Sequence, residues 1–222
     1  MDNKSSRGSA MACSSAPGFT LTELLISIAM MTLLATFTVT SLYSSQRKEE
    51  VVTAARVLAA DIRALQTRAL TAQNVKTCSA AGVNITCETG SSSCDVPASC
   101  APAPPYAVGA YFQSGLATYP FFADVDVTHK DGQDTPSAGE EFFTRSFITS
   151  GSAHVVISSL FAGTTTTETH VSFARQNGIM SIYPCTGACP SVTTLRITLT
   201  QQQSGDTATV SLNAITGRVS ID

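Results

Sequence analysis

The seven cysteines are the residues of this 222-residue chain whose chemistry is most informative. One of them, Cys13, lies in a short basic stretch at the start of the chain, Met1 to Gly18. If that stretch is removed, an even number of cysteines remains, as in a disulfide-bonded domain of an oxidising compartment. The remaining candidates for disulfides are Cys78, Cys87, Cys94, Cys100, Cys185 and Cys189.

The sequence leaves the pairing of these cysteines open. The four between Thr77 and Pro105 allow three connectivities, of which Cys78 with Cys87 and Cys94 with Cys100 is the simplest. In PCTGACP, prolines and a glycine predict a loop, and a small disulfide between its two cysteines is the default interpretation. A zinc site is the alternative, but the spacings do not resemble paired C-x-x-C ligands.

Carboxylates cluster in FADVDVTHKDGQD, where oxygen ligands could bind calcium. Asp124 and Asp126 are weak calcium candidates, because His129 stands where an EF-hand loop needs glycine, and a solvated acidic loop is favoured. The other histidines, His154 and His170, lie in unrelated segments. With no Ser/His/Asp or Cys/His cluster in the sequence, we expect neither an enzyme nor a cofactor.

Helices and strands must position these residues, and the first such element in the chain is an apolar segment. Leu24 to Tyr43 is a run of 20 residues without formal charge, enough for a helix to cross a bilayer core of about 30 Å. Its threonines are tolerated if their hydroxyls bond back to the preceding turn. A secretory signal peptide and a buried core helix are the alternatives, and the run is longer than either usually has. Arg47 and Lys48 mark the far membrane edge.

The helical pattern continues beyond the apolar run. From Arg47 to about Leu70, apolar residues recur at spacings of 4, 3, 4, 3 and 4, which predicts an amphipathic helix. Neither Gly nor Pro interrupts the chain from Phe19 to Leu70, so one helix of about 50 residues is expected. The stripe is too short for a coiled coil, which favours packing on a domain. Its members are Val51, Ala55, Leu58, Ile62, Leu65 and Ala69.

From Tyr106 onward the pattern predicts β-strands separated by Gly, Pro, Ser and Asp turns. Leu195, Ile197 and Leu199 alternate with polar residues, as in a strand with one buried face. A long helix followed by an antiparallel sheet is an α+β fold. The expected strands are Tyr106–Phe112, Ala117–Val125, Glu141–Thr149, His154–Phe161, Thr169–Ala174, Gly178–Ile182, Thr194–Thr200, Thr207–Leu212 and Ile215–Ile221.

The composition agrees with a folded domain and an added apolar segment. Hydrophobic residues make up 43% of the chain and charged residues 13%, which excludes a charge-rich disordered protein. The formal net charge of −3 gives no overall basic signal for nucleic acid.

The segment GFTLTELLISIAM resembles the prepilin N-terminus shared by type IV pilins and type II secretion pseudopilins. That pattern is a glycine, an apolar residue that is usually Phe, an acid at the fifth mature position, and a long apolar helix. Gly18, Phe19 and Glu23 match those three positions. In that family, prepilin peptidase cuts after the glycine and N-methylates the new first residue, here Phe19.

The resemblance also supplies a role for Glu23 in assembly. An ionised carboxylate at membrane depth is costly unless it is paired. The α-amine freed at Phe19 of a neighbouring subunit would carry the opposite charge, and pairing would fix the register of adjacent helices. The simpler alternative is that Glu23 lies at the level of the lipid headgroups.

The C-terminal half, with VSFARQNGIMSIYP and AITGRVSID, is similar to the H-type pseudopilin or FimT-like group of minor pilins. Some members of that group bind DNA through a Gly-Arg-x-Arg tail. Gly217 and Arg218 match its first two positions, but Ser220 stands where the second arginine would be. Between Val75 and Asp222, six basic residues stand against eleven acidic ones, too few for counterion-release binding. Arg218 is therefore a weak DNA-contact candidate, and a role at a turn is favoured.

The resemblance implies a pilin-like organisation of the chain: a leader at 1–18, a long helix at 19–72 whose first part, about 19–44, spans the membrane, a Cys/Ser/Pro-rich loop region at 73–105 and a β-rich domain at 106–222. It implies a structural minor subunit of a type IV pilus or a type II secretion pseudopilus. The subunit would first be a single-pass protein of the bacterial inner membrane with its C-terminal domain in the periplasm.

The expected partners are prepilin peptidase, other pilin or pseudopilin subunits, the inner-membrane assembly platform and membrane lipid, and nucleic acid is not expected. Two alternatives stay open. One is a DNA-binding or adhesive minor pilin at a pilus tip. The other is a membrane-anchored secreted domain unrelated to pilins.

Overall fold

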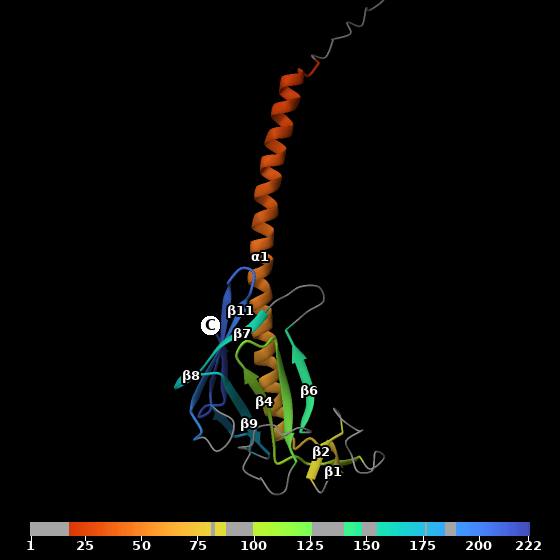
Figure 1. Ribbon diagram of the computed structural model, residues 1–222, viewed down its shortest axis with the longest axis vertical. Helices are drawn as coiled ribbons and strands as arrows, with labels where there is room; N and C mark the ends of the chain where they lie inside the picture. The colour runs from red at the N-terminus through yellow and green to blue at the C-terminus, as the bar shows by residue number, and fades with distance from the viewer. Residues whose placement is uncertain are drawn as a thin grey trace, which may run out of the picture. The chain divides into compact units, whose positions relative to one another are not determined.

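The computed structural model describes residues 18–80, 83–87, 100–125, 140–147, 155–175, 177–184 and 190–222. These residues form one helix and thirteen strands (Figure 1). The chain divides into two compact units, Met1–Tyr43 and Ser44–Asp222, which are described separately below.

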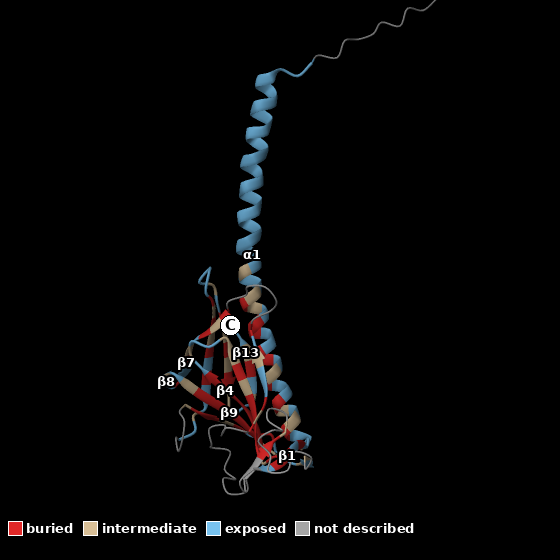
Figure 2. Cartoon of the chain, turned by 45° about the vertical axis from the view of Figure 1, so that its right-hand side comes forward, coloured by how far each residue is buried: buried red, intermediate tan, exposed pale blue. Residues whose placement is uncertain are grey.

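The helix α1 runs from Leu21 to Leu70, as the uninterrupted apolar and amphipathic pattern predicts. Among the described residues it is the one helix long and apolar enough to cross a membrane. Its residues in the first unit, Leu21 to Tyr43, are all exposed (Figure 2). Four threonine hydroxyls there donate to carbonyls three or four residues back, at 2.8–3.1 Å, so these hydroxyls are satisfied within the helix.

In the second unit, α1 is an amphipathic helix with one face in the domain core. All six residues of the predicted stripe are buried, together with Ala54 and Ala59. The buried face belongs to one continuous cluster with residues from both large sheets. The expected packing of this half of the helix on a domain is therefore confirmed, and the α+β class with it.

The first five-stranded sheet has the antiparallel order β10-β9-β4-β5-β6. Strand β6 forms one edge, with a register shift opposite Phe121 and Phe122. Among the side chains of this sheet, Tyr119 and Phe121 of β5 and Phe173 of β9 are buried in the core. The strands are β4 (Ala107–Gln113), β5 (Thr118–Asp124), β6 (Glu141–Ser146), β9 (Glu168–Ala174) and β10 (Met180–Tyr183).

The second five-stranded sheet has the antiparallel order β13-β12-β11-β7-β8. In β11, Leu195, Ile197 and Leu199 are fully buried, so the predicted alternation is confirmed. Arg63 of α1 donates to the carbonyl of Val219 in β13 at 2.9 Å, which ties the helix to this sheet. The strands are β7 (Val155–Ala162), β8 (Thr164–Thr166), β11 (Thr194–Gln201), β12 (Thr207–Asn213) and β13 (Arg218–Ile221).

The region expected as a loop, 73–105, instead contains a small antiparallel sheet of order β2-β1-β3. Central β1 (Val75–Ala80) pairs with β2 (Val83–Thr86) and with β3 (Ala101–Ala103). Pro102 is compatible with β3 because β3 is an edge strand. Thr86 also donates its hydroxyl to the carbonyl of Glu141 at 2.7 Å, which links this sheet to β6. Elsewhere, each expected strand overlaps an observed one.

Candidate functional site

The segment that carries the prepilin pattern lies at the start of α1. Gly18, Phe19 and Thr20 precede the helix and are exposed, Phe19 to 77%. Thr20 caps the helix, because its hydroxyl oxygen accepts a hydrogen bond from the Glu23 backbone N–H at 3.3 Å. Thr20 and Glu23 therefore occupy the first and last positions of a Thr-x-x-Glu capping box.

Glu23 has an exposed side chain in the first turn of α1. An acid there is favourable next to the unpaired N–H groups at the positive end of the helix. The carboxylate is thus exposed to a partner outside the chain, but it also stabilises the start of its own helix. Sequence reasoning missed this local role, although the Thr-x-x-Glu spacing was a readable signal for it.

The first half of α1, Leu21 to Tyr43, has a broad exposed apolar surface. Large side chains on all sides of this half of the helix are more than half exposed, among them Leu25 (59%), Leu33 (60%) and Phe37 (69%). A helix that is apolar all round is stable only in lipid or among other apolar helices. This surface and the Gly18–Glu23 segment together form a candidate assembly site.

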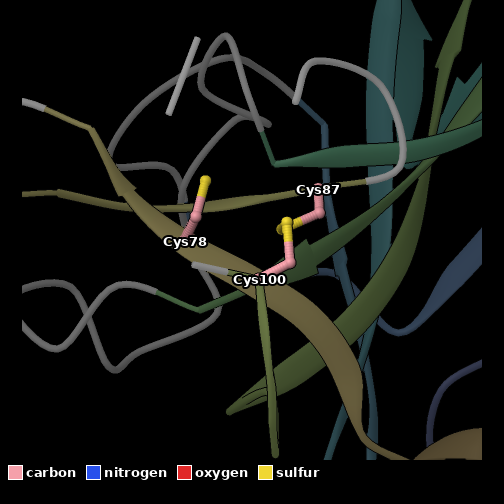
Figure 3. A group of neighbouring side chains, drawn as sticks. All are labelled: Cys78, Cys87 and Cys100. Carbon is pink, nitrogen blue, oxygen red and sulfur yellow. A yellow bond between two sulfur atoms is a disulfide. The ribbon is translucent and has the colours of Figure 1, made fainter. Parts of the chain in front are cut away.

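The cysteines do not pair in the simplest way. Cys87 and Cys100 form a disulfide, with their Cα atoms 6.2 Å apart (Figure 3). The expected bridges Cys78–Cys87 and Cys94–Cys100 are therefore wrong. The reason lies in the pairing of β2 and β3 on either side of β1, which brings the residue after β2 close to the residue before β3. Cys78 stands opposite Ile85, two residues away from Cys87 in register.

Cys78 is also disulfide-bonded. The three sulfur atoms of Cys78, Cys87 and Cys100 lie within 4.8 Å of one another (Figure 3). Such a triangle could hold a metal only as thiolates, and sulfurs in disulfides offer none. We therefore interpret this cluster as structural. The candidates Cys94, Cys185 and Cys189 lie outside the described residues.

The remaining predicted site residues are dispersed. Asp124 ends β5 and is buried, and its fellow calcium candidate Asp126 lies outside the described residues. Arg218 starts β13 directly after Gly217, whose φ of +63° makes the tight turn, and is exposed. His170 is fully buried with its ring stacked on Tyr183, centroids 4.8 Å apart, which is a packing role. His129 and His154 lie outside the described residues.

A polar network that the sequence did not reveal joins α1 to the first large sheet. Arg145 of β6 donates to both carboxylate oxygens of Asp61, at 3.0 Å and 2.9 Å. The hydroxyl of Tyr119 in β5 donates to the same carboxylate at 2.7 Å. These residues are 58 and 84 positions from Asp61 in the chain, so no local pattern announces them.

Electrostatics within this network are coupled. Burial, and then the hydrogen bond to Asp61, raise the pKa of Tyr119 well above that of a free tyrosine. The hydrogen bond to Asp61 also raises the pKa of Arg145, so that its charge is retained. Tyr119 therefore keeps its proton and Arg145 keeps its charge at neutral pH.

The network forms one end of an open groove with a volume of about 750 Å³. One wall is the last turns of α1, including Asp61 and Arg68, and the other is β6 with Phe143 and Arg145. Arg68 lies with its guanidinium 4.4 Å from the centre of the Phe142 ring. The groove is lined by both polar and apolar side chains, and it is the second candidate site.

Comparison of the chain with models of known protein families, with curated proteins and with solved structures found no match. A function therefore has to be inferred from the residues of the chain itself.

Proposed function

We propose that the chain is a structural subunit of the pilin class, either a minor subunit of a type IV pilus or a pseudopilin of a type II secretion system. The observation that carries this proposal is the division of α1. Its first half, shortly after Gly18 and Phe19, exposes its apolar side chains all round, while its second half buries one face against a β-rich domain.

Membrane anchoring is the first part of the proposed function. About 20 apolar residues in a helix match the thickness of a bilayer core. The threonine hydroxyls of this half are bonded to helix carbonyls, which removes most of their cost in lipid. The first half of α1 would hold the protein in the inner membrane until it is assembled.

Assembly is the second part. Within a membrane the hydrophobic effect does not drive helices together, so their association depends on close packing and on polar contacts. Glu23 supplies a charge near the start of the apolar run, and cleavage before Phe19 would supply an amine of opposite charge on the next subunit. Pairing of the two would set the axial register between subunits, which is a specificity device more than a source of stability.

The domain is the third part, and its disulfides agree with a periplasmic location. Cys87–Cys100 links two edge strands of the small sheet, and such bonds persist in oxidising compartments. The domain would present surfaces to neighbouring subunits while the helix holds it in the filament. The work of the protein would be mechanical, with prepilin peptidase, the assembly platform and other subunits as partners.

The experiment that tests this proposal is mass spectrometry of the mature protein, made in a host that has a prepilin peptidase. We expect a chain that begins at Phe19 and carries one N-methyl group. A chain that keeps residues 1–18, or one cut beyond Tyr43, would exclude the pilin class and leave an ordinary anchored or secreted domain.

A further inference from the structure

The groove between α1 and β6 has an aromatic floor. The ring of Phe121 stacks near those of Phe142 and Phe143, with centroids 6.2 Å and 5.7 Å apart. Phe121 and Phe142 are buried, whereas Phe143 is 45% exposed. An exposed aromatic ring beside two buried ones offers a ligand an apolar contact that the domain itself does not use.

The groove also holds the positive charge of Arg68, for which the described residues show no carboxylate partner. Within the part of the chain that the structure describes, the Nε atom of Arg68 is buried and has no hydrogen-bond acceptor, and the guanidinium lies over the Phe142 ring. A buried donor without an acceptor costs free energy that an incoming acceptor would recover. Arg145 differs, because Asp61 already neutralises it. Arg68 therefore gives the groove charge complementarity to an anion.

The length of the groove favours a chain over a compact molecule. Its helical wall runs from Asp61 to Thr71, about 15 Å at 1.5 Å per residue. An extended polypeptide covers that distance with about four or five residues. A small anion would satisfy Arg68 and leave the aromatic floor uncovered.

We propose that this groove binds an extended segment of a partner protein, in which an Asp or Glu pairs with Arg68 and a neighbouring apolar side chain covers Phe143. Arginine and carboxylate form two parallel charge-assisted hydrogen bonds, which supplies direction as well as affinity. The apolar neighbour distinguishes such a segment from a merely acidic one. The site is independent of the proposed filament role, because peptide docking requires neither cleavage at Gly18 nor assembly.

The test is a selection of displayed random heptapeptides on the full chain in detergent micelles. We expect enrichment of sequences with an Asp or Glu next to an aromatic or large aliphatic residue. The selected peptide is then synthesised with a fluorophore, and its dissociation constant is measured by anisotropy. Arg68→Gln should weaken binding by about ten-fold or more, as expected for loss of a charge-assisted pair.

Matched variants separate the proposed contact from general effects. Arg56→Gln removes the same charge from an exposed position of α1 outside the groove and should leave the affinity unchanged. Replacing the acid of the peptide by its amide should weaken binding to the wild type, but add little to the loss in Arg68→Gln. Arg68→Lys should restore part of the affinity, and Phe143→Ala should weaken binding without changing the preference for an acid.

Three outcomes would overturn the proposal. The first is a selection that yields no peptide or peptides without an acid. The second is an affinity for Arg68→Gln equal to that of the wild type. The third is an equal loss in Arg56→Gln, which would show attraction to the chain in general. Near-ultraviolet circular dichroism of each variant checks that its aromatic core is still folded.

Discussion

The two halves of α1 share one backbone conformation and differ in what surrounds them. In the first half, Leu33 and Phe37 are 60% and 69% exposed, while in the second half Leu58 and Ile62 are 0% and 1% exposed. Apolar content alone therefore does not tell whether a helix finds its partners within the chain. The second half finds them in the two large sheets, whereas the first half finds none among the described residues and, in the proposed function, finds them in lipid or in other chains.

Side-chain size also separates the halves. The buried face of the second half includes four alanines, which let the helix lie close to the sheets: Ala54, Ala55, Ala59 and Ala69. The first half presents Leu, Ile, Met and Phe on most sides, with threonines whose hydroxyls are bonded to the backbone. A close-fitting face suits one fixed partner surface, whereas a large apolar perimeter suits lipid and repeated helix contacts.

The largest effect is expected at Glu23, where the first half meets its proposed partner. Glu23→Gln removes the charge but still suits the capping box, since Gln serves there as well as Glu. We expect cleavage and methylation at Phe19 to continue, and incorporation into sheared filaments to fall by about ten-fold or more because an unpaired amine at membrane depth is costly. Immunoblots of filament and membrane fractions measure this ratio.

The control for Glu23 is Thr20→Ala, which removes the cap and keeps the charge. Loss of a helix cap costs about 1 kcal/mol, which should alter incorporation far less than loss of the charge pair. If Thr20→Ala reduces incorporation as much as Glu23→Gln, the role of Glu23 is local to the helix. Wild-type incorporation of Glu23→Gln would refute the charge pair altogether.

A pair of leucines tests the comparison of the two halves directly. Leu58→Ala opens a cavity in the core and should lower the free energy of unfolding of the domain by about 2–5 kcal/mol. Leu33→Ala, the same change in the exposed half, should leave it within about 0.5 kcal/mol of the wild type. Urea unfolding of the full chain in micelles, followed by near-ultraviolet circular dichroism, compares the two. Equal losses would mean that the first half is also part of the domain core.

Much of this fold was predictable because its signals are local. The uninterrupted apolar and amphipathic pattern predicted α1, and the alternation of Leu195, Ile197 and Leu199 predicted β11 with its buried face. The membrane-length run was readable from composition. Such features depend on neighbours a few residues away, so the sequence expresses them directly.

The missed features depend on distant residues. The strands β1, β2 and β3 lie in a region, 73–105, whose Ser-, Cys- and Pro-rich composition is typical of a loop. They form a sheet because they pair with one another and are linked by Cys87–Cys100. The groove and its network combine Asp61, Arg68, Tyr119 and Arg145, which meet only when α1 lies beside the first large sheet. The pairing of cysteines was likewise decided by the register of strands.

A smaller effect on stability is expected from the hydrogen bond between Tyr119 and Asp61, which lies in the second half of α1. In the unfolded chain Tyr119 loses its proton near pH 10, whereas burial and Asp61 raise its pKa in the folded state. The folded state therefore holds the proton more tightly, and its stability is retained below about pH 10 and falls as the pH rises further. With Tyr119→Phe, the stability of the folded state should fall less steeply as the pH rises.

Urea unfolding between pH 8 and about pH 11 measures that slope in both proteins. Tyr111 has its pKa raised to about 12, first by burial and then by its hydrogen bond to Glu168, so Tyr111→Phe should act in the same direction. Because Tyr111 lies in β4 and does not contact α1 through this bond, it is the matched comparison for Tyr119. Parallel slopes for wild type and Tyr119→Phe would show that folding does not raise the pKa of Tyr119 and that its contact with Asp61 adds no pH-dependent stability.

The smallest effect is expected where the second half of α1 ends. Gln73 donates to the carbonyl of Arg68 and Ala72 to that of Ala69, the bonds of a helix end that usually has glycine at its left-handed position. Ala72 occupies that position with a φ of +48°, which is unfavourable for a residue with a Cβ atom. Ala72→Gly should therefore stabilise the domain by about 0.5–1 kcal/mol in the urea measurement. A loss of stability would mean that the Ala72 methyl group makes contacts worth more than the strain, and that this end of α1 is held by packing instead of by its backbone bonds.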